Sequence, residues 1–271
     1  MLSNKHLEMR LDRQSCSLIA MLHVPALPGT PGHALEIDQI ISHVCEEATI
    51  LAALGYHGLL LENMHDLPYL NGGVGPEITA CMTAVAAAVR RETSLALGIQ
   101  ILAAANQEAL AVARAASLQF IRAEGFVFGH LADEGYIESC AGPLLRYRRQ
   151  INATDIRVFC DIKKKHSSHA ITADLSLAET ARAAEFFHAD GLIVTGNTTG
   201  EPPTTAELCE VRQASSLPLV VGSGVTADNI ASFLETADSV IVGSAIKQQG
   251  NWARPIDSDR AARLVEAAGI E

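Results

Sequence analysis

The stretch LVVGSGVTADNIASFLETADSVIVGSAIK (219–247) contains two short apolar runs, LVV and SVIV, separated by a helix-like segment at 226–235. Apart from the serine that opens the second, both runs are apolar and rich in Val, which is typical of parallel strands that are buried on both faces. Each run is followed directly by a glycine and a serine. The stretch therefore predicts a strand–helix–strand unit of a parallel sheet, with a glycine loop after each strand.

The same alternation of apolar runs and helix-like segments extends along the chain. The expected strands are 17–24, 58–62, 95–101, 120–124, 156–163, 191–195, 219–221 and 239–242. The expected helices are 36–54, 76–91, 106–116, 140–150, 176–188, 204–215, 226–235 and 258–268. Eight strands, each followed by a helix, predict a single (β/α)8 TIM barrel. An open doubly wound sheet is the alternative fold, but no GxGxxG motif follows the first strand.

Loop lengths and helix start signals add to this prediction. Pro76 fits a first helical position, and Ser176 and Thr204, each followed three residues later by Glu, form capping-box patterns. Helix-to-strand connections are short, whereas several strand-to-helix connections are long. The long ones are 25–35, 63–75, 125–139 and 196–203. In a barrel these loops all emerge where the strands end, which is where barrel active sites lie.

Composition limits the class of protein. The chain has 271 residues, 48% of them hydrophobic, which suits one barrel over residues 17–271 after an N-terminal extension, 1–16. A net charge of −11 disfavours a nucleic-acid partner. No apolar run reaches the roughly 18 residues of a transmembrane segment, and residues 1–17 lack an apolar signal core. Six scattered cysteines predict reduced thiols and a cytoplasmic protein, and barrels commonly form symmetric homo-oligomers.

A phosphate site is predicted at the ends of the last two strands. Gly222, Ser223 and Gly224 follow one strand, and Gly243 and Ser244 follow the next. Barrels often bind phosphate with these two loops, and glycines let backbone N–H groups approach the oxygens. The two serine hydroxyls add donors. The alternative is that these glycines only turn the chain from strand to helix.

The fifth expected strand ends in a charged run. Because strand side chains alternate, Asp161, Lys163 and Lys165 share one face, and Ile162 and Lys164 share the other. The apolar Ile162 fits the helix-facing side, so we expect Asp161 and Lys163 to point into the barrel. Such a pair can transfer protons, hold a metal-bound substrate or, through the lysine, form a Schiff base. The alternative is a structural ion pair, with Lys164 and Lys165 in solvent.

Further polar residues end other strands. His23 ends the first, Glu62 and Asn63 end the second, and Arg122 and Glu124 share a face at the end of the fourth. Glu62 suits a general base or a ligand of a divalent metal such as Mg²⁺, and Arg122 suits a carboxylate or phosphate. A buried salt bridge is the alternative for each charged residue.

Two other polar sites follow later strands. Thr195 ends the sixth expected strand and is predicted to line the pocket. His130, Asp133 and Glu134 lie in the fourth long loop without a distinctive ligand spacing, so we expect them to be solvated.

Seven phrases at strand ends together resemble the BtpA family, which includes SgcQ-like proteins. They are LIAMLHVPALPGTPG (18–32), LLENMHDLPY (60–69), FIRAEGFVFGHLADEG (120–135), DIKKKHSSHA (161–170), IVTGNTTG (193–200), VVGSGVTADN (220–229) and IVGSAIK (241–247). The resemblance implies a TIM barrel and a role in accumulating photosystem I proteins. Through the SgcQ-like members, which are associated with sugar-uptake gene clusters, it also implies a metabolic enzyme. Many relatives carry an Arg-Asn-Asp-like motif after strand three, where this chain has AAAN (103–106).

Three functions are consistent with these residues. The first is an enzyme on a small phosphorylated metabolite such as a sugar phosphate, of isomerase, epimerase or aldolase type. In it, Asp161, Lys163 and Glu62 would transfer protons and Arg122 would neutralise developing negative charge. The second is a non-catalytic biogenesis or stability factor for a photosystem I-type membrane complex. The third is an FMN-binding barrel that uses the same two glycine loops.

Overall fold

The computed structural model describes residues 17–196 and 200–269. The expected N-terminal extension, 1–16, lies outside the described residues. So do residues 197–199 of the sixth long loop and the last two residues, 270–271.

Eight parallel strands form a closed barrel, as the sequence predicts. They are β1 (Ser17–His23), β2 (Gly58–Glu62), β3 (Ala96–Gln100), β4 (Phe120–Ala123), β7 (Arg157–Ile162), β9 (Gly191–Val194), β10 (Leu219–Val221) and β11 (Ser239–Val242). Their order around the barrel is β1-β11-β10-β9-β7-β4-β3-β2. The ring closes at β1, where Ile19 pairs with Gly58 of β2 on one side and with Ile241 of β11 on the other. The (β/α)8 barrel is therefore confirmed, and the open sheet is excluded.

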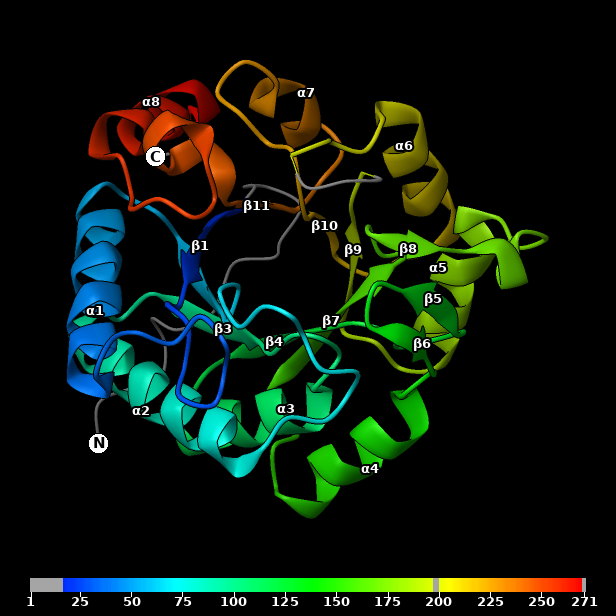
Figure 1. Cartoon of the computed structure of the whole chain (residues 1–271). Helices are drawn as coiled ribbons and strands as arrows, with labels where there is room; N and C mark the ends of the chain where they lie inside the picture. The colour runs from blue at the N-terminus through cyan, green and yellow to red at the C-terminus, as the bar shows by residue number, and fades with distance from the viewer. Residues whose placement is uncertain (1–16, 197–199, 270–271) are drawn as a thin grey trace.

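A ring of helices covers the outside of the barrel (Figure 1). They are α1 (Ile37–Ala53), α2 (Pro76–Glu92), α3 (Asn106–Ala115), α4 (Ala141–Gln150), α5 (Leu177–Phe186), α6 (Thr205–Ala214), α7 (Ile230–Leu234) and α8 (Ser258–Ala268). Both predicted capping boxes form, at Ser176 and at Thr204. The helix expected at 226–235 starts late. The Asn229 amide accepts from the N–H of Thr226 and donates to the carbonyl of Gly224, so a side-chain-bonded turn replaces the first helical turn.

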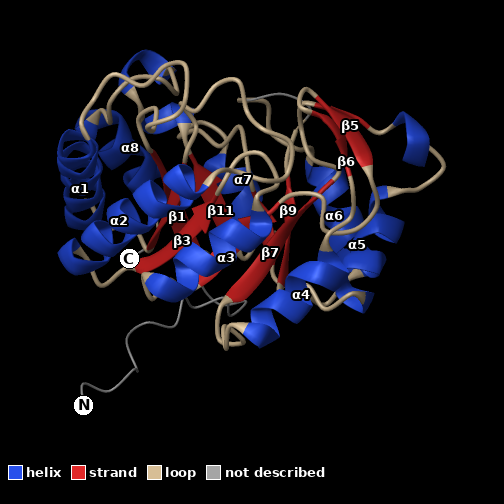
Figure 2. Cartoon of the chain, turned by 60° about the horizontal axis from the view of Figure 1, so that its bottom comes forward, coloured by secondary structure: helices blue, strands red, loops and turns tan. Residues whose placement is uncertain are grey.

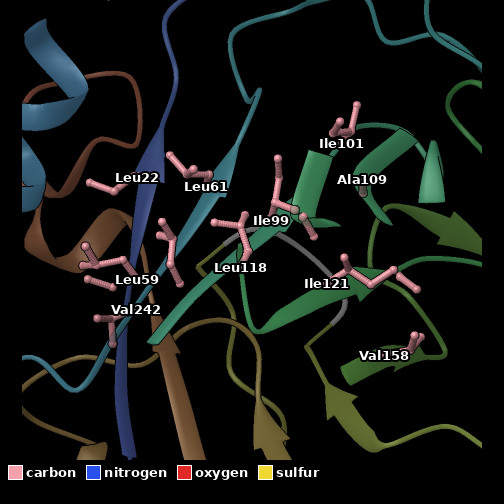
Figure 3. Close-up of a cluster of buried hydrophobic side chains, with 14 of the residues drawn as sticks. Leu22, Leu59, Leu61, Ile99, Ile101, Ala109, Leu118, Ile121, Val158 and Val242 are labelled. Carbon is pink, nitrogen blue, oxygen red and sulfur yellow. The ribbon is translucent and has the colours of Figure 1, made fainter. Parts of the chain in front are cut away.

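Strand alternation divides the buried side chains into two cores. The inner core fills the barrel and consists of Ile19, Met21, Leu60, Ala96, Phe120, Phe159, Ile193, Val220 and Ile241. The outer core lies between strands and helices, and Figure 3 labels Leu22, Leu59, Leu61, Ile99, Ile101, Ala109, Leu118, Ile121, Val158 and Val242 from it. Continuing the inner alternation toward the strand ends leads to His23, Glu62, Gln100, Arg122 and Asp161. The apolar filling therefore gives way to polar side chains at the carboxyl end of the barrel.

A small antiparallel sheet stands at this end of the molecule. It consists of β5 (His130–Ala132), β6 (Gly135–Ile137) and β8 (Ser167–Ser168), in the order β6-β5-β8. Figure 2 shows β5 and β6 among the long loops at one end of the barrel. The sequence predicts none of these three strands, because runs of two or three residues are too short to show a periodicity. The described residues also form three short 3₁₀ turns, η2 (Ala170–Thr172), η3 (Ser244–Ile246) and η4 (Gln248–Gly250).

Candidate active site

A cavity of 440 Å³ occupies the mouth of the barrel at the carboxyl ends of the strands. The predicted residues that line it are His23, Glu62, Arg122, Glu124, Lys165, Gly222, Ser223, Gly224, Gly243 and Ser244. Four other predicted residues do not line it: Asn63, Asp161, Lys163 and Thr195. Most of the site residues that were predicted from the ends of the strands therefore line one cavity.

One side of the cavity is built from the loops after β10 and β11. Gly224 has a φ of +69°, and a Cβ at this position would overlap Pro202, so the loop requires glycine. Within the described chain, no hydrogen bond uses the N–H groups of Gly224, Val225, Ser244 or Ala245. Four free backbone donors at the wall of one cavity form a suitable cradle for an anion.

A cation stands beside this cradle. Arg260 of α8 lines the cavity, and its Nε donates to the carbonyl of Ala245 at 2.9 Å. This bond fixes the guanidinium against the loop after β11, where its remaining N–H groups can bind the same anion as the backbone donors. No pattern in the sequence indicates Arg260, because it comes from a helix and not from a strand end.

The hydroxyl of Ser223 is not available to a ligand, contrary to the sequence-based prediction. Its Oγ donates to the carbonyl of Glu201 at 2.9 Å and accepts from the N–H of Gly196 at 3.1 Å. The side chain therefore holds the loop after β9 against the loop after β10. Ser244 also lines the cavity, and no hydrogen bond to a described residue engages its hydroxyl.

Arg122 and Asp161 form a bidentate ion pair beneath the cavity. Nε donates to Oδ2 at 2.9 Å and Nη2 to Oδ1 at 2.8 Å, with side-chain exposures of 6% and 1%. Burial opposes the charge on Arg122, but Asp161 more than compensates and raises the pKa of the guanidinium further above its usual value. Arg122 lines the cavity, whereas Asp161 does not. Asp161 is therefore the counterion that orients Arg122, and it does not line the cavity where its predicted proton transfer would take place.

The predicted position of Lys163 is also wrong. β7 ends at Ile162, and Lys163 has a φ of +52°, so the strand alternation stops one residue before it. Its Nζ donates to the carbonyl of Leu175 at 2.6 Å, outside the cavity. Lys164 turns inward instead, 9% exposed, and its Nζ lies 3.2 Å from Oε2 of Glu124. The expectation that Lys164 is solvated is corrected accordingly.

Glu124 is fully engaged within the protein. Gln100 Nε2 donates to its Oε1 at 3.0 Å, and the N–H of Ala104 donates to its Oε2 at 3.0 Å, beside the Lys164 ion pair. Burial raises the pKa of Glu124, and Lys164 counters that rise. The other amide atom, Oε1 of Gln100, is buried with no hydrogen-bond partner among the described residues, and Gln100 lines the cavity. A ligand hydroxyl would satisfy this acceptor.

His23 and Glu62 face each other at the ends of the neighbouring strands β1 and β2. His23 Nδ1 lies 2.9 Å from the carbonyl of Trp252, so we assign the proton to Nδ1, and Nε2 then becomes an acceptor 3.8 Å from Oε2 of Glu62. Burial lowers the pKa of His23 to about 3, so the ring is neutral. Burial likewise raises the pKa of Glu62, and no hydrogen bond engages its carboxyl within the described part of the chain. Glu62 is therefore a carboxyl free to exchange a proton with a ligand.

Asn63 and Thr195 lie outside the lining of the cavity. Asn63 Nδ2 donates to Asp66 at 2.9 Å, and its Oδ1 accepts from the N–H of Leu102 at 2.7 Å, so it clamps two loops together. Thr195 Oγ1 is buried without a hydrogen bond to any residue that the structure describes. Neither residue lines the cavity, so their predicted place as pocket residues is wrong. Asn63 follows the inward Glu62 and so falls on the other face of the chain, whereas Thr195 lies beneath Gly222.

The fourth long loop contributes residues that were expected to be solvated. Asp133 and Glu134 line the cavity, and Glu134 lies 3.8 Å from Lys164. His130 is 5% exposed, with its ring centroid 5.5 Å from that of His169. The β5–β6 hairpin buries His130 and half-buries Glu134, which loop composition does not reveal, and it leaves Asp133 exposed as expected.

Residues 17–196 and 200–269 contain no group of three or more His, Cys, Asp or Glu side chains arranged to hold a metal ion. Over the same ranges, no helix is long and apolar enough to cross a membrane.

Fold and site together define a TIM barrel with free backbone N–H groups and titratable side chains at the mouth of the barrel. Residues 14–269 match the BtpA family, so the chain belongs to this family. An uncharacterized mitochondrial protein of Caenorhabditis elegans is 44% identical over 254 residues, 92% of this chain and 91% of the relative. The photosystem I biogenesis protein BtpA of Synechocystis is 33% identical over 251 residues, 92% and 87% of the two chains.

A solved structure shares the fold at low sequence identity. The (S)-3-O-geranylgeranylglyceryl phosphate synthase of Thermoplasma acidophilum, in complex with its substrate sn-glycerol-1-phosphate, superposes with a TM-score of 0.58. The match covers 94% of each chain at 14% identity. This likeness bears on the architecture alone.

Proposed function

We propose that the cavity binds a small phosphorylated metabolite, such as a sugar phosphate, and that the protein is an enzyme acting on it. The observation that carries this proposal is the meeting of two features in one cavity. Free backbone N–H groups of Gly224 and Ser244 stand beside Arg260 on one wall, and the unengaged carboxyl of Glu62 stands on another. The structural neighbour that binds sn-glycerol-1-phosphate is consistent with this ligand class.

Each group in the cavity then has a chemical task. The cradle and Arg260 hold the phosphoryl group, which fixes the rest of the metabolite over the barrel axis. Glu62 moves a proton to or from the substrate, since its raised pKa brings it closer to neutral pH. Arg122, held in place by Asp161, stabilises the negative charge that develops on a substrate oxygen. Isomerisation, epimerisation and retro-aldol cleavage all use such a set.

The proposal is tested by thermal unfolding against inorganic phosphate, a panel of sugar phosphates and FMN, with and without Mg²⁺. A ligand at 100 times its dissociation constant adds about 2.7 kcal/mol to the free energy of unfolding. Ser244→Asp places a carboxylate in the cradle and abolishes this stabilisation. Ser117→Asp adds the same charge in an exposed connection between α3 and β4, at the opposite end of the barrel, and retains it. Equal responses of the two variants would contradict the proposed phosphate site.

A second candidate function is a biogenesis or stability factor without catalysis. The name of the Synechocystis relative favours it, at 33% identity over nearly the whole chain. The same panel separates the two, because an assembly factor has no need for selective stabilisation by one phosphorylated ligand. Selective stabilisation by FMN would instead indicate a flavin protein. A cytoplasmic homo-oligomer, as expected from the sequence, remains part of the proposal.

A further inference from the structure

Lys165 is the cationic side chain in the cavity that the protein leaves unengaged. Arg122 is paired with Asp161, Lys164 with Glu124, and Arg260 donates to a backbone carbonyl. No hydrogen bond or ion pair within the described ranges engages Nζ of Lys165, although this side chain lines the same cavity. A half-buried amine without a partner is costly, which makes it a candidate for reaction with a ligand.

The backbone around Lys165 is held in place. Its carbonyl accepts from Oγ of Ser167 at 3.2 Å, and the carbonyl of Lys164 lies 2.9 Å from Nε2 of His169. Left-handed residues flank the pair, with φ values of +52° at Lys163 and +53° at His166. The turn therefore presents Lys164 and Lys165 to the cavity while it directs Lys163 away.

The surroundings favour a neutral amine. Burial lowers the pKa of Lys165, and the neighbouring guanidinium of Arg122 lowers it further, against the opposite effect of Glu62 and two other carboxylates. A neutral amine has the lone pair that a nucleophile needs. Glu62, close enough to influence Lys165 electrostatically, is also a carboxyl that no hydrogen bond engages in the described structure.

We propose that Lys165 is the nucleophile of the site and forms an imine with the carbonyl group of a phosphorylated ketone or aldehyde. This deepens the proposed function, on which it rests, by naming the substrate class and the covalent step. It also replaces the sequence-based assignment of a Schiff base to Lys163, which lies outside the cavity.

The step balances with the groups at hand. The Nζ lone pair attacks the carbonyl carbon, the C=O π pair moves to oxygen, and a proton from Glu62 neutralises that oxygen. Transfer of a proton from nitrogen gives a neutral carbinolamine and restores the carboxyl of Glu62. The carbinolamine then expels its hydroxyl as water, with a proton from Glu62, and leaves a protonated imine. Nothing is oxidised or reduced, and Arg122 stabilises the oxygen while it carries negative charge.

Pyridoxal 5′-phosphate is a suitable probe, because it combines an aldehyde with a phosphate and does not presuppose the natural substrate. The full chain is incubated with it, reduced with sodium borohydride, and mapped by peptide mass spectrometry. Borohydride delivers a hydride to the imine carbon and fixes the adduct as a secondary amine. The comparison uses wild type, Lys165→Met and the control Lys163→Met, each with and without excess inorganic phosphate, and each checked for cooperative unfolding.

The expected result is one adduct on Lys165, which is lost in Lys165→Met, retained in Lys163→Met and diminished by inorganic phosphate. Labelling of other lysines that is unchanged in Lys165→Met overturns the assignment of the nucleophile. If phosphate still stabilises the protein thermally, that outcome leaves the proposed function standing. An adduct on Lys165 that inorganic phosphate does not diminish would support Lys165 as the nucleophile and contradict the proposed phosphate site.

Discussion

Removal of Arg122 provides a quantitative test of the polar layer beneath the cavity. Arg122→Met keeps most of the aliphatic side chain but leaves the Asp161 carboxylate, 1% exposed, without the two hydrogen bonds of 2.8 and 2.9 Å that now compensate its charge. Breaking a buried pair by removing one partner costs about 3–5 kcal/mol. We therefore expect the free energy of unfolding to fall by about that amount.

The double variant Arg122→Met/Asp161→Leu is the matched control. Replacing both buried charges with apolar groups is often neutral or stabilising, so we expect it to recover most of the loss. Urea unfolding at fixed pH and ionic strength gives both free energies and the interaction energy of the cycle. A single-variant loss below about 1 kcal/mol, or no recovery in the double variant, would refute a buried, mutually dependent pair.

Three further predictions concern other parts of the molecule. In the wild type, Nζ of Lys247 lies 2.8 Å from Oε2 of the buried Glu47. Lys247→Met leaves this carboxylate without its counterion and is expected to lower the free energy of unfolding in urea by about 3–5 kcal/mol. His23 has a folded pKa of about 3 against 6.5 ordinarily, so between these values the unfolded chain binds more protons and stability falls as pH falls. The free energy of unfolding, measured at a series of pH values, should fall more steeply in wild type than in His23→Gln, by up to about 1.4 kcal/mol per pH unit. Gly224→Ala strains a positive φ and collides with Pro202, so calorimetry should show a lower Tm and no stabilisation by phosphate.

The sequence locates residues on regular strands better than residues on the turns that follow. Alternation within strands places Glu62 and Arg122 correctly at the cavity, because the pleat fixes the side of each side chain. The same rule fails at Lys163, where a left-handed backbone ends the alternation and directs Lys164 inward. The change of φ has no signature in a run of three lysines.

Strand alternation also cannot predict site residues that come from elements other than the barrel strands. Arg260 reaches the cavity from α8, and Glu134 from a hairpin too short to show a period. The hydroxyl of Ser223 is engaged by a carbonyl of the preceding long loop, which no local spacing reveals. Gln100 was within reach, because it continues the inward alternation of β3 beyond Ala96.

A crystal structure of the protein grown with sn-glycerol 1-phosphate is the most direct test of the phosphate cradle. We predict phosphoryl oxygens within hydrogen-bond distance of the N–H groups of Gly224 and Ser244, with the guanidinium of Arg260 beside them. The glycerol hydroxyls should then extend toward Glu62 and Lys165. A phosphoryl group bound at Lys164 and Lys165 instead, with the cradle unoccupied at saturating ligand, would contradict the assignment of the two loops.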